Sequence, residues 1–235
     1  MKSIADVCRW GLNLVVILSL LGPALGQDQK AARPKRQPHP SLAPVTDDPA
    51  LPRVLLIGDS ISMGYTVPVR EALAGKANVH RPMTNCGPTI RGLEQLDQWL
   101  GDGRWDVIHF NFGLHDLRKT DGKHQVPLDE YEKNLKQIVA RLQKTGAKLI
   151  WCSTTPVPEG CQPMREPEDA PAYNAVAKKV IDDAGIATDD LYGFSLPRLK
   201  EIQLPANVHF SPAGSAVLAE QVAKSIREAL EKAKP

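Results

Sequence analysis

The chain of 235 residues is long enough for one domain of ordinary size with a substantial apolar core. Hydrophobic residues make up 42% and charged residues 24% of it, as in a typical soluble globular protein. The formal net charge of +2 and the sparse aromatic residues give no basic-aromatic stripe, so the composition excludes a nucleic-acid-binding protein.

The first 26 residues have the layout of a signal peptide. Lys2 and Arg9 lie near the start, residues 11–22 form a short apolar run, and small residues precede Gln27. Because this run is too short for a comfortable membrane span, we expect cleavage, with no stable span left afterwards. The sequence therefore predicts a secreted or periplasmic protein. The alternative is an uncleaved membrane anchor.

Residues 27–51 are rich in proline, carry a basic cluster and lack hydrophobic periodicity. A segment of this composition cannot bury enough apolar surface to order itself, so we expect a flexible linker. The folded domain is then expected to span residues 52–235.

Within this domain, apolar strand patterns alternate with amphipathic helix patterns. The run of aliphatic residues at 54–57 is typical of a buried strand in a parallel sheet. We expect strands at residues 54–57, 78–81, 105–112, 147–152 and 186–191, and helices starting at Pro68 and covering residues 93–100, 128–144, 172–184 and the stretch that follows Ser211-Pro212.

This alternation predicts an α/β fold, with a parallel sheet of about five strands covered by helices on both faces. Right-handed crossovers place every strand-to-helix loop at one edge of such a sheet, where ligands bind. Ser60, Gly87, His115 and Cys152 each follow a predicted strand, so we expect them to gather at that edge.

Ser60 comes directly after the first strand and is either a nucleophile or a helix N-cap. A serine hydroxyl needs a base to accept its proton, and His209, in the loop before the last helix, is the best candidate. Acyl transfer also needs hydrogen-bond donors for the oxyanion. The backbone amides of Ser60 and Gly87 can serve, together with a side chain from the turn at residues 113–116.

Four short blocks resemble, in order and spacing, those of the SGNH hydrolases, also called GDSL esterases. These blocks are Gly58-Asp59-Ser60-Ile61-Ser62, Gly87, Gly113-Leu114-His115-Asp116 and His209. The resemblance implies a flavodoxin-like three-layer α/β/α sandwich and ester hydrolysis through an acyl-Ser60 intermediate, with His209 as general base. It implies no metal and no organic cofactor.

The third block departs from the family pattern, because His115 stands where the family usually has an asparagine that donates to the oxyanion. A neutral imidazole also donates one hydrogen bond, so His115 can take over this role. Asn111 is the alternative donor, and a third possibility is that His115 only ties its loop together. We expect Asp116 to bond loop amides rather than to take part in catalysis.

The histidine block departs as well, because Ala206 stands where the family usually has an aspartate, and Asn207 is neutral. The sequence leaves two arrangements open. Either Ser60 and His209 work as a dyad that a backbone carbonyl orients, with Asp59, Asp116 and Asn207 as candidate supporting residues, or a carboxylate from another loop orients the histidine. The spacing does not choose among the carboxylates of Asp189, Asp190 and Glu201.

The long loop that begins at Thr154 is expected to lie above the same edge, with Glu159, Arg165 and Tyr173 lining a substrate cleft. The expected export favours a small polar ester, such as an acylated carbohydrate, as substrate. Two other functions stay open, a non-catalytic glycan-binding module and an acyltransferase at the same site.

Cys152 and Cys161 bracket a proline-rich loop, and we expect them to form a disulfide if any pair does. The cysteine spacing does not resemble a metal site.

Overall fold

The computed structural model of the chain describes residues 38–231, so the expected signal peptide at residues 1–26 lies outside the described residues. A five-stranded sheet runs through this part in the order β2-β1-β3-β6-β7, and every neighbouring pair is parallel. Its strands are β1 (Arg53–Ile57), β2 (Asn78–His80), β3 (Val107–Phe110), β6 (Lys148–Cys152) and β7 (Ala187–Asp189).

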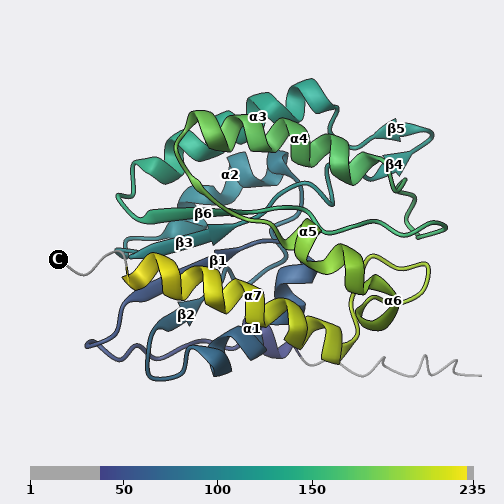
Figure 1. The fold of residues 1–235 in the computed structure, drawn as a ribbon. Coiled ribbons are helices and arrows are strands. Elements are labelled where there is room, and N and C mark those ends of the chain that lie inside the picture. Colours follow the sequence, from purple (N-terminus) through teal and green to yellow (C-terminus); the bar gives the residue numbers. More distant parts are fainter. Residues whose placement is uncertain (1–37, 232–235) are drawn as a thin grey trace, which may run out of the picture. The chain divides into compact units, whose positions relative to one another are not determined.

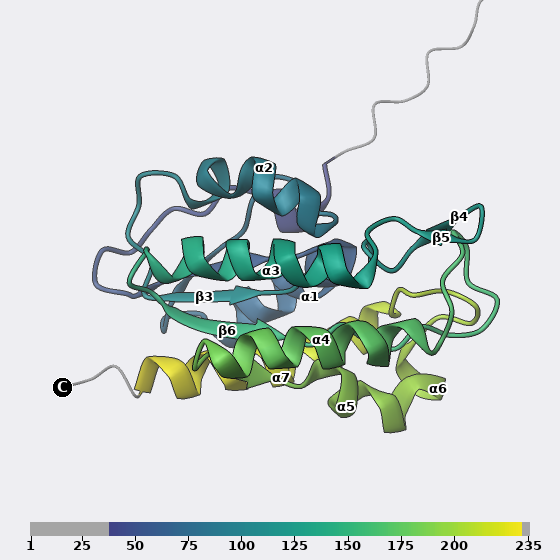
Figure 2. The same ribbon diagram turned by 90° about the horizontal axis from the view of Figure 1, so that it is seen from above.

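Helices cover both faces of the sheet, so the three-layer α/β/α sandwich is confirmed. Figures 1 and 2 show α2, α3 and α4 on one face, and α1 and α7 on the other. The bounds of these helices are α1 (Ser60–Ala72), α2 (Thr89–Leu100), α3 (Leu128–Gln143), α4 (Asp169–Asp183) and α7 (Pro212–Glu231). No helix among residues 38–231 is long and apolar enough to cross a membrane.

The strands are buried because both faces of the sheet are covered. The four aliphatic residues at 54–57 in β1 are each at most 1% exposed, and all four residues of β3 are buried. Such strands read as continuous apolar runs rather than alternating ones.

We expected the first helix to begin at Pro68, but it begins eight residues earlier, at Ser60. Asp59 caps it, and Ile61, Tyr65 and Val69 bury one face of α1, which packs along α7. Pro68 lies inside the helix, so tertiary packing outweighs the cost that proline usually brings to a helix interior.

Several short elements have no counterpart among the expected ones, because they are too short to show a hydrophobic period. They are a hairpin of β4 (Lys119–Thr120) and β5 (Lys123–His124), the helices α5 (Leu191–Ser195) and α6 (Leu199–Ile202), and two 3₁₀ turns, η1 (Pro40–Leu42) and η2 (Leu196–Arg198).

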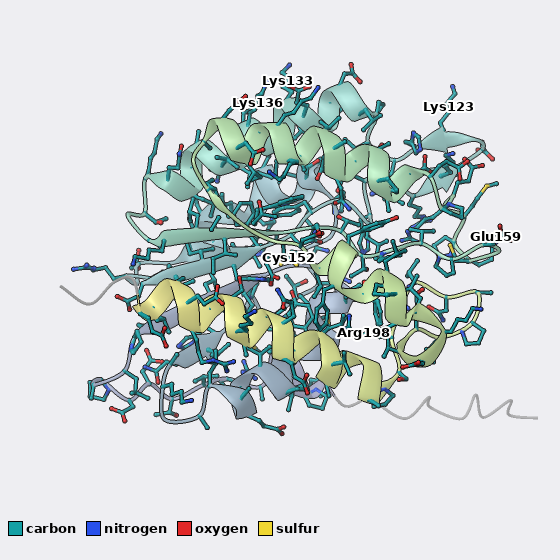
Figure 3. All side chains as sticks on the ribbon, viewed as in Figure 1. Lys123, Lys133, Lys136, Cys152, Glu159 and Arg198 are labelled. Carbon is teal, nitrogen blue, oxygen red and sulfur yellow. The ribbon has the colours of Figure 1, made fainter. Side chains whose placement is uncertain are left out.

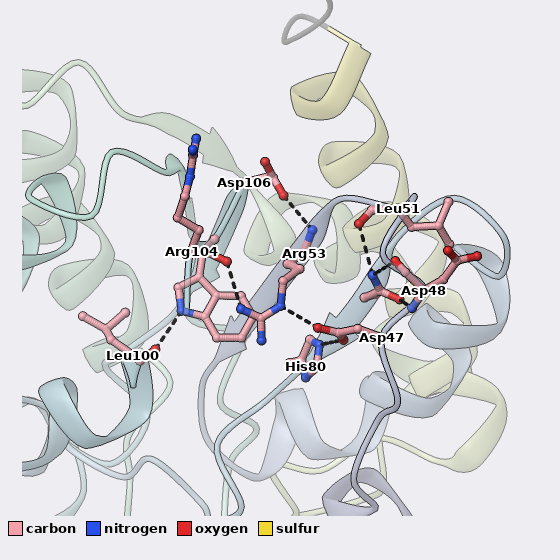
Figure 4. A network of polar contacts seen from close by, with 10 residues as sticks. Asp47, Asp48, Leu51, Arg53, His80, Leu100, Arg104 and Asp106 are labelled. Atoms are coloured by element: carbon pink, nitrogen blue, oxygen red, sulfur yellow. Dashed lines mark hydrogen bonds and ion pairs between the residues drawn. The ribbon is translucent and has the colours of Figure 1, made fainter. Parts of the chain in front are cut away.

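The expected flexible linker is wrong for residues 38–51, which are bound to the domain. The side chain of Asn78 accepts from the Asp48 N–H at 2.9 Å and donates to the carbonyls of Asp48 and Leu51. Arg53 Nε donates to Asp47 at 2.8 Å (Figure 4). Ser41 is fully buried. The composition of this segment did not reveal that it is ordered, because its order comes from hydrogen bonds and contacts with residues of the domain.

The expected disulfide is not formed. Cys86, Cys152 and Cys161 are all free and buried. Each packs in the core as a small apolar side chain, a common role for free cysteine.

Candidate active site

Ser60 is the first residue of α1, directly after β1. The helix cap is Asp59, whose Oδ1 accepts a hydrogen bond from the Ile61 N–H at 2.9 Å. The serine hydroxyl is therefore not used as a cap, and its Oγ lies 2.8 Å from Nε2 of His209. This is the distance of a hydrogen bond through which a base can take the serine proton.

Asn207 fixes which nitrogen of His209 carries the proton. Its Oδ1 lies 3.0 Å from the backbone nitrogen of His209 and 2.7 Å from Nδ1 of the same residue. A backbone N–H only donates, so this atom of the amide must be the oxygen, and the ring must donate to it from Nδ1. Nε2 is then the acceptor that faces Ser60, as a general base requires.

The backbone on both sides of His209 is held to the domain. Gln203 and Phe210 form a β-bridge, and the Leu204 N–H donates to the His209 carbonyl at 3.0 Å. Val208 and Phe210 are buried, at 4% and 8% exposure, on either side of the exposed imidazole. The ring is therefore presented to Ser60 from a fixed loop.

The carboxylates left open by the sequence have other positions. Asp189 bonds His109 and Gln221, Asp190 bonds Ser153 and the Gly193 N–H, and Glu201 is exposed. The hydrogen-bond partner of His209 Nδ1 is the neutral side chain of Asn207.

Two backbone amides are available near Ser60 as oxyanion donors. The N–H of Ser60 is at the start of a helix and has no intrahelical acceptor. Gly87 follows β2 with a φ of +66°, a conformation that favours glycine. Its N–H donates to Oδ1 of Asn85 at 2.9 Å, so an oxyanion must share or replace that acceptor.

His115 lies half-buried in the turn after β3. None of the residues 38–231 forms a hydrogen bond with its ring, so it does not tie the loop together. Burial lowers its pKa; nearby Arg165, Arg118 and Arg91 lower it further, and Asp59 opposes them. The imidazole is therefore neutral at neutral pH and keeps one N–H to donate.

The alternative donor, Asn111, is used elsewhere. Its Nδ2 donates to the Cys152 carbonyl at 2.7 Å and to Oγ1 of Thr154 at 3.2 Å. Both amide hydrogens therefore join the end of β3 to the end of β6, which argues against an oxyanion role.

Asp116 holds the turn that carries His115. Its Oδ1 accepts from both the N–H and the hydroxyl of Thr89, the first residue of α2, at 2.8 and 2.5 Å. Burial raises the pKa of Asp116 to about 7. Asp116 thus bonds a backbone amide, as we expected.

The sequence model of the GDSL-like lipase/acylhydrolase family matches residues 56–217, which contain all the catalytic candidates above. The chain belongs to this family. Its members are ester hydrolases, and this chain is therefore an ester hydrolase of the GDSL/SGNH type. No curated protein matches the chain in sequence.

Solved structures of similar proteins share the fold of this family member. A lipase/acylhydrolase from Enterococcus faecalis has a TM-score of 0.66 at 20% identity, over 75% of this chain and 96% of its own. The acetyl xylan esterase AlAXEase has a TM-score of 0.64 at 18% identity, over 74% and 99%. An acetylxylan esterase from Geobacillus stearothermophilus has a TM-score of 0.62 at 20% identity, over 74% and 94%.

The three residues expected to line a substrate cleft do not do so. Tyr173 is fully buried and its hydroxyl donates to the Val126 carbonyl. Arg165 is 6% exposed and donates to the Leu114 carbonyl, so it supports the turn of His115 from behind. Glu159 is exposed at the outer end of its loop (Figure 3).

The groove of this acylhydrolase instead lies between the starts of α1 and α7. It has a volume of about 490 Å³ and is lined by His39, Ser60, Ile61, Gly64, Pro68, His209, Phe210, Pro212 and Ser215. A second cavity of about 10 Å³ has Asp59, Ile61, Asn111, Leu114 and Thr154 among its walls, but neither Ser60 nor His209 lines it.

Sequence reasoning missed the groove residues that follow His209, and it missed His39. It named Asn207 only as a possible support. An asparagine that bonds the backbone two residues onward is a known turn signal, and it marks Asn207 as held against His209.

His109, Cys152 and Asp189 form a group that can hold a metal ion, with their ligand atoms within 4.8 Å of one another. All three are buried, as Figure 3 shows for Cys152 between the layers. Burial, together with nearby Asp189, raises the pKa of the Cys152 thiol well above its usual range. A thiol that stays protonated is a poor metal ligand.

Proposed function

We propose that the protein is an exported serine esterase that hydrolyses small polar esters, with acylated carbohydrates as the substrate class. The observation that carries this proposal is the hydrogen-bonded series from Ser60 through His209 to Asn207. It gives the base the tautomer that nucleophilic catalysis needs, although the usual aspartate is absent.

In the first step, Ser60 Oγ attacks the carbonyl carbon of the ester while its proton passes to Nε2 of His209. The carbonyl oxygen becomes an oxyanion, which the amides of Ser60 and Gly87 and the ring of His115 stabilise. The bond to the alcohol oxygen then breaks, and His209 returns the proton to that oxygen. The products are a free alcohol and acyl-Ser60.

In the second step, water attacks the acyl carbon as His209 Nε2 takes one of its protons. A second oxyanion forms in the same place and collapses, the bond to Ser60 Oγ breaks, and His209 gives the proton back to the serine. The acid leaves, and the enzyme is restored without any metal or redox step.

The structurally similar proteins support a short acyl group. Two of the structurally similar proteins are acetyl xylan esterases, which agrees with acetyl as the acyl group.

The test is hydrolysis of p-nitrophenyl acetate and p-nitrophenyl butyrate by the purified protein, beside Ser60→Ala and His209→Ala. We expect the wild type to prefer acetate and both variants to fall to background. A fluorophosphonate probe should label Ser60 in the wild type alone. A folded wild type that hydrolyses neither ester and takes no label contradicts the esterase and favours a binding module.

Export rests on the layout of residues 1–26 and has its own test. Expression of the full chain in a bacterial host, followed by fractionation, should give a protein outside the cytoplasm that starts near Gln27. A product in the cytoplasm with its N-terminus intact contradicts export.

A further inference from the structure

A residue from outside the family's matched region borders the catalytic groove. His39 lines the same groove as Ser60 and His209, although it precedes residues 56–217. It belongs to the segment that we expected to be a flexible linker. This segment therefore contributes to the site as well as to the fold.

The turn that carries His39 is fixed on the domain. The 3₁₀ turn η1 packs against α1, and Ser41 within it is fully buried. Nδ1 of His39 lies 2.8 Å from the Ser41 hydroxyl and accepts from the Ser41 backbone N–H at 3.3 Å. Because Nδ1 is an acceptor, the neutral ring carries its proton on Nε2. None of the residues 38–231 accepts a hydrogen bond from that nitrogen, so a residue of the groove wall keeps a donor for a bound molecule.

The chemistry of the proposed reaction decides which part of the ester occupies this groove. The alcohol oxygen must lie beside Nε2 of His209 to receive its proton when the ester bond breaks. The groove includes His209 and the residues just after it, but neither Gly87 nor His115 lines it. The groove therefore extends from Ser60 in the direction of the leaving alcohol, and away from the Gly87 amide and the His115 ring.

The walls of the groove combine apolar side chains with hydrogen-bonding ones. Ile61, Pro68, Phe210 and Pro212 give apolar surface, whereas His39 and Ser215 give hydrogen-bonding groups. Gly64 lets α7 approach closely, since a Cβ there would lie 3.0 Å from the Ser215 hydroxyl. A sugar ring has apolar C–H faces and hydroxyls at its edge, so it suits both kinds of wall. A volume of about 490 Å³ is in the range of small-molecule sites.

We propose that this groove is the alcohol subsite, that it takes a hydroxylated ring such as a sugar, and that His39 binds the ring by donating from Nε2 to one of its oxygens. This inference rests on the proposed esterase function and adds the position of the alcohol and a residue that selects it.

The experiment compares His39→Ala and His39→Gln with the wild type on two acetate esters, a mono-acetylated methyl xyloside and phenyl acetate. The acyl group is the same in both, so only the alcohol differs. We expect His39→Ala to lower kcat/KM for the xyloside by about 3- to 10-fold, mainly through KM, as for loss of one neutral hydrogen bond. Phenyl acetate should be unaffected, and His39→Gln, which keeps an N–H donor, should recover most of the loss.

The control is His124→Ala, which alters a partly exposed histidine bonded to Asp169 and outside the groove. It should leave both esters unchanged. An equal loss on both esters in His39→Ala means a merely structural turn and overturns the inference, as does no loss on the xyloside. A wild type that hydrolyses phenyl acetate but not the xyloside overturns the sugar subsite. Fluorophosphonate labelling of Ser60 separates these outcomes from failure of the esterase itself, in which no label is taken.

Discussion

Two side chains in this site, Asn207 and His115, stand where the family pattern has other residue types. Asn207 stands in for an aspartate, and its oxygen holds both the backbone N–H and the ring Nδ1 of His209. It orients the base but brings no charge to stabilise the imidazolium that forms during the reaction. His209 therefore lies between the hydroxyl of Ser60 and a neutral third side chain.

Two substitutions of Asn207 distinguish the effect of orienting the His209 ring from the effect of a negative charge beside it. We expect Asn207→Ala to lower kcat by about 100-fold or more, because the ring loses its partner. Asn207→Asp should keep the geometry and add a charge that favours the imidazolium, so the acid limb of the pH–rate profile should move to higher pH. Steady-state kinetics from pH 5 to 9 on p-nitrophenyl acetate measure both. An Asn207→Ala enzyme with wild-type kcat would show that the partner is not needed.

His115 is the second substituted residue, and its role as a donor is testable in the same way. His115→Ala should lower kcat by about 10²- to 10³-fold with little change in KM, as for loss of an oxyanion donor. His115→Asn, the usual family residue, should recover most activity. Because burial lowers the pKa of His115, it stays neutral at working pH, and the acid limb should be the same in His115→Asn. Full activity in His115→Ala would place the donor elsewhere.

At the scale of elements, the turn after β3 is attached to the start of α2 by Asp116. Its Oδ1 accepts two hydrogen bonds from Thr89, while its buried Oδ2 has no partner among the described residues. Gly113 begins the same turn with a φ of +147°, and a Cβ there would lie 2.2 Å from Oγ1 of Thr154. The turn is thus fixed between β6 and α2, and this fixes where His115 lies.

The buried Asp116 should make stability depend on pH. Burial raises its pKa from 3.8 to about 7, so between these values the folded state binds more protons than the unfolded state. Stability must then fall as the pH rises through this window. Asp116→Asn keeps the oxygen that faces Thr89 but does not titrate. We expect its melting temperature, relative to the wild type, to rise from pH 4 to pH 7.5, as measured by calorimetry. Parallel curves would contradict the raised pKa.

At the scale of the whole molecule, a buried polar group joins the centre of the sheet to its edge strand and to α7. Oδ2 of Asp189 in β7 lies 3.0 Å from Nε2 of His109 in β3, and its Oδ1 accepts from Gln221 of α7 at 2.9 Å. Asp189 and His109 are at most 1% exposed. Removing the acceptor leaves the buried donor of His109 and the half-buried donor of Gln221 without a partner, so the group links the layers.

We expect Asp189→Ala to lower the free energy of unfolding by about 3 to 5 kcal/mol, as for one partner removed from a buried pair. Urea denaturation measures it. The control is Asp182→Ala, which removes an exposed partner of Lys178 and should cost about 0.5 kcal/mol or less. Because Asp189 bonds His109 rather than His209, kcat per folded molecule should not change in Asp189→Ala. A large loss of kcat in the folded variant would instead indicate that Asp189 takes part in catalysis.

The sequence by itself determined the layers and the sheet edge that carries the chemistry. Apolar runs such as residues 54–57 and the helical period of α3 are local signals, and the handedness of crossovers then brings Ser60, Gly87 and His115 to one edge. The distance of 2.8 Å between Ser60 and His209 agrees with the roles the sequence suggested for them.

Only the tertiary structure decided which other side chains lie near Ser60 and His209 and which do not. Tyr173 is in the core, Asn111 is held by the end of β6, and the turn of His39 is docked on α1. Nothing in the local pattern distinguishes these outcomes, because each depends on hydrogen bonds and burial between segments far apart in the chain. Periodicity reports which face of an element is buried, and the partner that buries it is fixed only when the layers have packed.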